Sequence, residues 1–376
     1  MPELQQEALA SRGKAIFVGF DHASTLLVSH VNQEIHHFAS SLHSQSERFR
    51  IWATQLDMTV QLDIGCSSVV TCVGFSRDGQ LLVAGFSLGA AVYEIKHGAI
   101  VSKAYPPGLI VGDEGVEFGP SEYVRGADFT LDGKHILLAC ENKVISVHDV
   151  LDGRVVVTLI GHEQDVYSVQ VSPDGNFAVS AGGDKTARIW SLNNWTLTKV
   201  FQLGDGGTMA KFSPDGRSIA VSTLDENICI YDASTAGLIA KLTGCNNSVY
   251  GVAFAHDGRS IYGASLDHTI KLWELSGEEN VRRPHSDFHG FEDYALSVTC
   301  MARSRCVAGA SKDKTVRIWD TDTGEALCIL KGYRNSVISV VTSSTDTLLA
   351  TASGDKSVAV WRYRSLGDAK DEGLTV

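Results

Sequence analysis

Apolar runs of strand length, separated by short polar turns, recur along residues 66–361. The clearest unit contains Ser168–Val171, Phe177–Ser180 and Ala187–Trp190, and each run is alternating or fully apolar. Such runs, rich in small, β-branched and aromatic residues, are typical of β-strands. The first two flank a Ser-Pro-Asp-Gly turn, which suits a tight hairpin because glycine accepts a positive φ angle. The pattern predicts an all-β region whose strands are joined by tight turns.

The strand unit is repeated seven times, and each clear copy ends with an aromatic residue six positions after an Asp. The clear copies pair Asp184 with Trp190, Asp225 with Tyr231, Asp267 with Trp273, Asp313 with Trp319, and Asp355 with Trp361. Two degenerate copies come first, one with Asn142 before His148 and one that ends at Tyr93. From His148 onward the ends recur every 41 to 46 residues. A period of about 40–45 residues with a GH-to-WD pattern corresponds to one four-stranded blade. We therefore expect a seven-bladed WD-repeat β-propeller over residues 58–363.

The ring also needs a strand that closes it. Met58, Val60, Leu62 and Ile64 alternate with polar residues. This stretch suits the strand that completes the last blade, and closure removes the exposed sheet edges that promote aggregation.

The clearest repeat contains His162, Ser180 and Asp184, a set that resembles a hydrolase triad. No nucleophile elbow or oxyanion loop accompanies the three residues. We interpret them, together with Trp190, as a buried hydrogen-bond network that fixes the loop ends against the third strand. Cys245, Phe291 and Tyr333 occupy the His162 position in later repeats, so we expect those blades to depend more on apolar packing.

Composition excludes several functional classes. The formal charge is −12 and no Lys/Arg-rich run reaches five residues, so direct binding to nucleic acid is not expected. None of the eight cysteines forms a CxxC pair, which favours free buried thiols in a reducing compartment over zinc or disulfides. No stretch approaches the roughly 20 apolar residues of a membrane span. We expect no metal, no cofactor and no enzymatic activity, because no paired acids or cofactor loop stands out.

The N-terminal segment, residues 1–57, has a different period. Apolar residues from Val28 to Leu56 are spaced by three and four positions, which favours a helix with a narrow seam. This coiled-coil-like seam could bind a partner helix, drive self-association, or pack on the side of the propeller. Two further departures are an insertion at residues 103–122, interpreted as a long loop, and a polar tail at 364–376.

Several blades carry phrases beyond the common repeat. Residues 161–168, residues 333–340, and residues 248–252 with 265–273 resemble blade phrases of the Tup-type (Groucho-like) fungal transcriptional corepressors. The His-less fourth repeat and the insertion after the first repeat also have counterparts there, and the resemblance covers about residues 58–363. It implies a nuclear corepressor whose propeller holds short segments of DNA-binding repressors.

Partner contacts are expected at the rim of the central channel. Counting back from the end of each innermost strand's apolar core gives a ring of one residue per blade, and Asn335 lies just before the last of these strands. Aromatic and apolar anchors at a concave rim are what a peptide-binding hot spot needs. The ring comprises Thr71, Arg125, Tyr167, Thr208, Tyr250, Leu296 and, with a slip of one position, Ile338.

The sequence thus favours a non-catalytic nuclear scaffold, a corepressor that binds DNA-binding transcription factors through its rim. Basic histone tails are plausible secondary ligands because the chain is negatively charged. The alternative is a cytoplasmic signalling scaffold like the G-protein β subunits, which also place a helix before seven blades.

Overall fold

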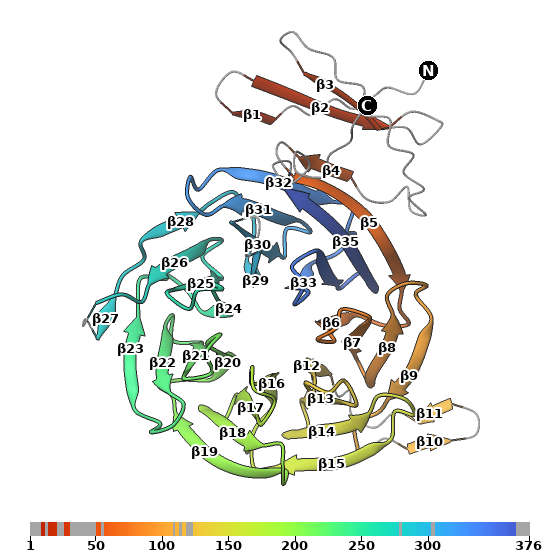
Figure 1. Ribbon diagram of the computed structural model, residues 1–376, viewed down its shortest axis with the longest axis vertical. Coiled ribbons are helices and arrows are strands. Elements are labelled where there is room, and N and C mark those ends of the chain that lie inside the picture. Colours follow the sequence, from red (N-terminus) through yellow and green to blue (C-terminus); the bar gives the residue numbers. More distant parts are fainter. Residues whose placement is uncertain are drawn as a thin grey trace, which may run out of the picture.

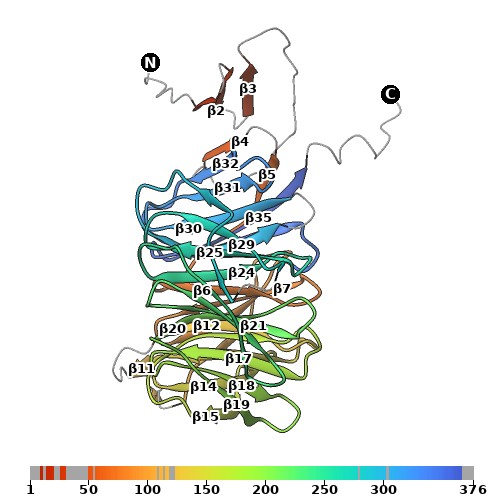
Figure 2. The same cartoon turned by 90° about the vertical axis from the view of Figure 1, so that its left-hand side faces the viewer.

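In the computed structural model, seven sheets are arranged around a central axis (Figure 1). The side view shows that the ring of sheets is a disc (Figure 2). The structure describes residues 9–11, 14–20, 26–30, 50–53, 56–107, 110–112, 115–117, 123–277, 280–301 and 305–365. All regular elements in these ranges are strands, so the expected all-β seven-bladed propeller is confirmed.

Blades one to four follow the chain, and each runs from an inner to an outer strand. Blade one contains β6 (Val70–Phe75), β7 (Leu81–Phe86), β8 (Gly89–Glu94) and β9 (Ile100–Ala104). Blade two contains β12 (Val124–Phe129), β13 (His135–Cys140), β14 (Val144–Asp149) and β15 (Val155–Ile160). Blade three contains β16 (Val166–Val171), β17 (Phe177–Gly182), β18 (Thr186–Ser191) and β19 (Thr196–Gln202). Blade four contains β20 (Gly207–Phe212), β21 (Ser218–Thr223), β22 (Ile228–Asp232), β23 (Leu238–Leu242) and the added β27 (Val281–Arg282).

Blades five to seven complete the ring. Blade five contains β24 (Val249–Phe254), β25 (Ser260–Ser265), β26 (Ile270–Glu274) and β28 (Ser286–Phe288). Blade six contains β29 (Ala295–Met301), β30 (Cys306–Ser311), β31 (Val316–Asp320), β32 (Ala326–Lys331) and the added β4 (Arg50–Ala53). Blade seven contains β33 (Val337–Thr342), β34 (Leu348–Ser353), β35 (Ser357–Ser365) and β5 (Leu56–Gly65).

Two small sheets lie outside the ring (Figure 1). One consists of β1 (Leu9–Ser11), β2 (Lys14–Phe20) and β3 (Leu26–His30). The other is the hairpin of β10 (Ile110–Gly112) and β11 (Gly115–Glu117), which lies within the insertion that was expected to be a loop.

Closure of the ring follows the prediction. β5 pairs antiparallel with β35, from Leu56 against Ser365 to Gly65 against Ser357. The buried Met58 joins the core between blades six and seven. A strand from near the start of the chain therefore completes the blade made by its last strands, and the ring has no open sheet between its first and last blades.

The prediction of an N-terminal helix is wrong for those residues of the segment that the structure describes. Residues Leu26–His30 form β3 and Arg50–Ala53 form β4, so one continuous helix from Val28 to Leu56 is not present. β4 pairs antiparallel with residues 328–331 of β32, the outer strand of blade six. An open sheet edge offers unpaired N–H and C=O groups. Pairing with these groups outweighs the helical preference that the three- and four-residue spacing of the apolar residues indicates. Residues 31–49 lie outside the described part.

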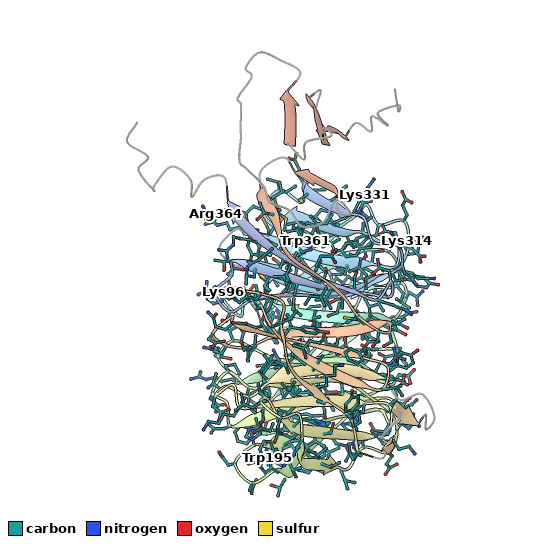
Figure 3. All side chains as sticks on the ribbon, turned by 90° about the vertical axis from the view of Figure 1, so that its right-hand side faces the viewer. Lys96, Trp195, Lys314, Lys331, Trp361 and Arg364 are labelled. Atoms are coloured by element: carbon teal, nitrogen blue, oxygen red, sulfur yellow. The ribbon has the colours of Figure 1, made fainter. Side chains whose placement is uncertain are left out.

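The core lies between neighbouring blades. The tryptophans that end the third strand of blades three, five, six and seven are fully buried, and each packs on the inner strands of its own or the adjacent blade. Figure 3 shows Trp361 among the stacked sheets, whereas Lys314 and Lys96 lie on opposite faces of the disc.

Hydrogen bonds link the four residues of the predicted network in blade three. Trp190 Nε1–H donates to Ser180 Oγ at 2.9 Å, and the Ser180 hydroxyl lies 2.8 Å from His162 Nε2. His162 Nδ1 lies 2.9 Å from Asp184 Oδ2, and that oxygen also accepts from Arg188 at 3.2 Å. Every proton has one acceptor when the imidazole is neutral with its hydrogen on Nδ1. The four residues thus serve the fold, as a buried chain of hydrogen bonds.

Blade seven, where Tyr333 occupies the His162 position, keeps part of this hydrogen-bond network beside its apolar packing. The Tyr333 hydroxyl lies 2.8 Å from Thr351 Oγ1 and accepts from Trp361 Nε1 at 3.3 Å. Tyrosine and threonine therefore rebuild the link that histidine and serine make in blade three. In blades five and six the indole N–H instead donates to the backbone carbonyls of Thr243 and His289.

Replacement of Ser180 by alanine tests the blade-three network. Ser180→Ala leaves buried polar atoms of His162 and Trp190 without a partner, so we expect the free energy of unfolding to fall by about 1–3 kcal/mol. Urea denaturation measures this change. Ser276→Ala, at an exposed serine after β26, serves as the control and should change it by less than about 0.5 kcal/mol. Equal effects of the two substitutions would contradict the assignment.

The network also predicts a pH dependence of stability. Burial lowers the pKa of the His162 imidazole, despite the neighbouring Asp184 carboxylate, and lowers that of His148. The unfolded chain therefore binds protons first as the pH falls, and this stability is complete above pH ~6.5 and decreases below it. Each histidine should remove up to about 1.0 kcal/mol between pH 6.5 and 5.5. Urea denaturation at both pH values should show a smaller decrease for His148→Asn and an unchanged one for the exposed His97→Asn.

Candidate functional site

One residue in each inner strand is displaced by a β-bulge. In β16, for example, Val166 pairs with Gly182 and Ser168 pairs with Ala181, so Tyr167 has no partner in the ladder. Bulges re-aim a side chain out of the regular alternation. The same register shift occurs near the start of all seven inner strands, which surround the channel in Figure 1.

The displaced residues are the ring that the sequence predicted. They lie at one end of the channel, on the face that carries the loops leading into the inner strands. We call them the bulge ring; its members are Thr71, Arg125, Tyr167, Thr208, Tyr250, Leu296 and Ile338.

The two threonines of the bulge ring face inward. Thr71 and Thr208 are 6% and 8% exposed. The Thr208 hydroxyl lies 2.6 Å from the Val249 carbonyl of the next blade, and the Thr71 hydroxyl bonds to the equivalent carbonyl of Val124. Thr71 was expected to contact a partner, but its hydroxyl instead joins neighbouring blades, because it is short enough to fold back on the bulge.

The other five members keep exposed surface. Tyr250 is 40% exposed, Arg125 is exposed, and Tyr167, Leu296 and Ile338 are half-buried. The structure therefore brings three large apolar or aromatic anchors besides Tyr250 and Arg125 to one rim.

Arg125 is held in a fixed position. Its Nε donates to Glu141 Oε1 at 2.7 Å, and its Nη2 donates to the same oxygen. The guanidinium also lies 5.0 Å from the centre of the Tyr123 ring. A guanidinium fixed by a carboxylate and an aromatic ring costs little conformational entropy when a partner contacts it.

Tyr167 lies at the acidic part of the rim. A Cβ atom on Gly183 would come within 3.4 Å of the Tyr167 hydroxyl, so the ring lies against that turn. Burial first, and then the Asp165 carboxylate, raises the pKa of Tyr167. Burial first, and then the Glu141 carboxylate, raises the pKa of Asp165. Two carboxylates thus lie near Tyr167; Arg125 already pairs with Glu141, and a basic side chain of a partner could approach Asp165.

Sequence reasoning missed a second group at the rim. Lys312 Nζ lies 4.7 Å from the centre of the Tyr294 ring, and the His268 ring meets Tyr294 edge-on at 5.7 Å. Tyr294 and Tyr123 each precede a bulge-ring residue by two positions. An aromatic residue at that offset was the signal available in the sequence.

Asn335 is exposed, but its side-chain amide already makes hydrogen bonds within the protein. Its Oδ1 accepts from the Ser336 backbone N–H at 2.8 Å, which leaves the Nδ2 group near the Gly354 carbonyl at 3.5 Å. It lies on the same face as Ile338, so the predicted position is compatible with a partner contact.

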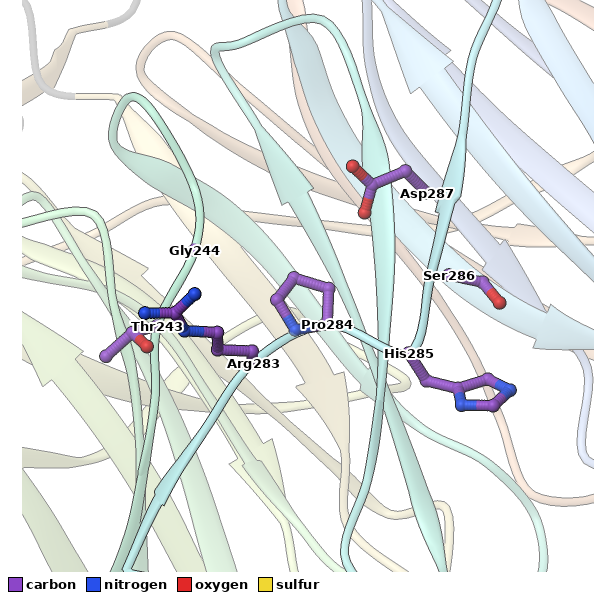
Figure 4. A pocket seen from close by; sticks show the side chains of 7 residues that line it. All are labelled: Thr243, Gly244, Arg283, Pro284, His285, Ser286 and Asp287. Carbon is purple, nitrogen blue, oxygen red and sulfur yellow. The ribbon is translucent and has the colours of Figure 1, made fainter.

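An open hollow lies at the outer side of the disc, away from the bulge ring (Figure 4). Its one carboxylate already has a partner, since Asp287 accepts from Lys271 at 2.8 Å. No cluster of metal-ligating side chains occurs among the described residues, and no helix there is long and apolar enough to cross a membrane. The hollow is lined by Thr243, Gly244, Arg283, Pro284, His285, Ser286 and Asp287.

Substitutions at the buried and at the exposed members of the bulge ring should change the free energy of unfolding by different amounts. Thr208→Val removes a buried donor that joins two blades, and the free energy of unfolding should fall by about 1–3 kcal/mol. Tyr250→Ala removes an exposed ring and should change it by about 0.5 kcal/mol or less. Chemical denaturation of the two variants distinguishes a structural from a surface role. A loss for Tyr250→Ala as large as that for Thr208→Val would contradict the division.

Comparison with known proteins agrees with this geometry. The sequence profile of the WD domain, G-beta repeat (WD40), matches residues 59–90, 153–191, 237–274, 283–320 and 324–362. Autophagy-related protein 16 of Arabidopsis thaliana is 24% identical over 211 residues, which are 56% of this chain and 38% of that protein.

Other relatives belong to different processes by name. Nuclear distribution protein PAC1 of Arthroderma otae is 29% identical over 181 residues, 42% of this chain and 39% of that protein. Protein SPA1-RELATED 4 of Arabidopsis thaliana is 26% identical over 222 residues, 57% of this chain and 27% of that protein. The aligned part thus spans about two fifths or less of these relatives. What the sequence, the structure and the relatives share is the repeat, and the chain is a seven-bladed propeller built from WD40 repeats.

Proposed function

We propose that this chain is a non-catalytic scaffold that binds extended peptide segments of partner proteins across the bulge ring. One observation carries the proposal: the same bulge in all seven inner strands directs one residue per blade to a single rim, and five of these residues keep exposed surface. WD40 propellers generally bind other proteins.

The composition of the rim supports a peptide ligand. Tyr167, Tyr250 and Leu296 offer apolar area, and Arg125 adds a fixed cation. Tyrosine and arginine are enriched among the residues that carry most of the binding energy at interfaces. The Asp165 carboxylate favours a segment that places a basic side chain beside Tyr167.

We further propose that the partners are DNA-binding transcriptional repressors and that the chain acts as a corepressor in the nucleus. The blade phrases at residues 161–168, and at 248–252 with 265–273, which resemble Tup-type corepressors, support this assignment. The formal charge of −12 supports contact with DNA through partners rather than directly, and histone tails suit the acidic part of the rim.

The second candidate is a cytoplasmic signalling scaffold of the G-protein β type. It rested on a helix before the seven blades, and the described ends of that segment are the strands β3 and β4. A helical partner on residues 28–56 therefore has less support than binding at the bulge ring.

The test compares the proteins captured by the natural chain with those captured by a rim variant. Tyr167→Ala/Leu296→Asp removes two anchors of the bulge ring. Ile239→Ala/Leu238→Asp makes matched changes at exposed residues of β23, 42% and 57% exposed, on the outer side of the disc. Both variants are first checked by thermal unfolding, and captured proteins are quantified by mass spectrometry.

We expect the rim variant alone to lose transcription factors and chromatin proteins, by at least about tenfold for segments anchored there. Loss of cytoplasmic signalling subunits instead would support the second candidate. If the rim variant captured the same proteins as the natural chain, the proposal that the bulge ring binds peptides would be contradicted.

A further inference from the structure

The outer edges of two blades already receive an extra strand. In blade four, β27 runs parallel to β23, and the N–H groups of Lys241 and Thr243 donate to the carbonyls of Asn280 and Arg282 at 2.7 and 2.9 Å. In blade six, β4 pairs antiparallel with residues 328–331 of β32. The outer edge of this propeller thus accepts a fifth strand in either direction.

A bulge in the outer strand defines where the added strand binds. The unpaired residue is Ile239 in β23, Leu327 in β32 and Val156 in β15. The added strands pair with the residues that follow, and their equivalents in blade two are residues 157–160. By this alignment, Thr158 and Ile160 correspond to Lys241 and Thr243, so their N–H groups point away from the blade.

Blade two differs from the other blades in the chemistry of this edge. The outermost four-residue stretch of each other blade, or β28 in blade five, carries a charged side chain, which hinders pairing with an unselected strand although β27 and β4 do pair beside Lys241 and Lys331. Residues 157–160 are Val-Thr-Leu-Ile and carry none. Ile160 is 76% exposed and Val156 is 49% exposed. The charged residues of the other blades are Lys103, Lys199, Lys241, Asp287, Lys331 and Asp63.

We propose that β15 pairs antiparallel with β15 of a second copy of this chain, which makes the protein a symmetric dimer. A two-fold axis through Thr158 places Thr158 opposite its own copy and Val156 opposite Ile160 of the other chain. The outward N–H and C=O groups of Thr158 and Ile160 then lie in the ladder, and the exposed Ile160 and Val156 side chains cover each other. An isologous contact of this kind closes on itself and leaves no further edge.

Charge complementarity favours a second copy over an unrelated strand. Arg154 precedes β15 and Glu163 follows it, and both are exposed. In the antiparallel register centred on Thr158, the Arg154 end of one strand lies beside the Glu163 end of the other. The symmetry produces this pair of opposite charges twice, and the ladder between them contains no charge to repel the copy.

The position of β15 leaves room for another disc. β15 lies on the convex circumference, across the ring from β4 and the sheet of β1, β2 and β3, and no described strand lies outward of it (Figure 1). Two discs can therefore meet edge to edge, and both bulge rings remain open because they lie on the faces of the discs.

Sedimentation velocity of the full chain at about 1–100 µM tests the proposal. We expect the mass to rise to that of two chains. Ile160→Lys replaces, in both strands of the dimer, the exposed apolar side chain that covers Val156 of the other copy, and it should raise the dissociation constant at least about tenfold. The matched control is Gln202→Lys at the equivalent exposed position of β19, which should dimerise like the natural chain.

A charge exchange keeps the test independent of folding defects. Arg154→Glu should weaken the dimer, and adding Glu163→Arg should restore it, which a loss of fold could not do. A natural chain that has the mass of one copy at every concentration, including one that captures another protein's strand, would overturn the proposal. So would an unchanged dimer in Ile160→Lys.

Discussion

The structure depends on how the inner strands satisfy their free edges. Each inner strand has one sheet partner, so its other edge carries backbone groups that need partners inside a closed ring. Side chains of the preceding blade supply them. Ser168 Oγ accepts from the Ala210 N–H at 2.9 Å, Gln170 Oε1 accepts from the Phe212 N–H at 2.8 Å, and Asp128 Oδ2 accepts from the Val171 N–H at 2.8 Å. Ring closure is therefore a matter of hydrogen bonds between side chain and backbone, as well as of apolar packing.

The same constraint explains the bulge ring. Inner strands approach so closely that a Cβ atom on Gly126 would lie 2.9 Å from Ser168 Cα, and one on Gly251 would lie 2.9 Å from Ser297 Cα. The residue before each of these glycines is displaced from the ladder and turns to the rim. A contact needed for packing thus also positions Arg125 and Tyr250 for recognition, which links the scaffold to its binding surface.

The sequence predicted the features that repeat and missed those that occur once. Seven copies of one unit specify the blade count and, by an offset that is constant except for a one-residue slip at Ile338, the bulge ring. The offset does not predict that Thr71 bonds to the next blade whereas Tyr250 stays exposed, because that difference depends on the length of the side chain at the bulge. The segment around β4 was misread for a similar reason: its apolar spacing fits a helix, but β32 offers it a sheet edge.

The outer edges are where the blades diverge most. Each inner strand packs against the equivalent strands of two neighbouring blades, and this contact constrains its sequence. An outer strand only has to remain unpaired or find a partner. Blade four is covered by β27, blade six by β4, and most other edges carry a lysine or aspartate. The uncharged edge of β15 is the exception, and strand pairing there uses backbone groups while the rim uses side chains. Because the two surfaces use different chemistry and face different directions, occupation of one leaves the other accessible.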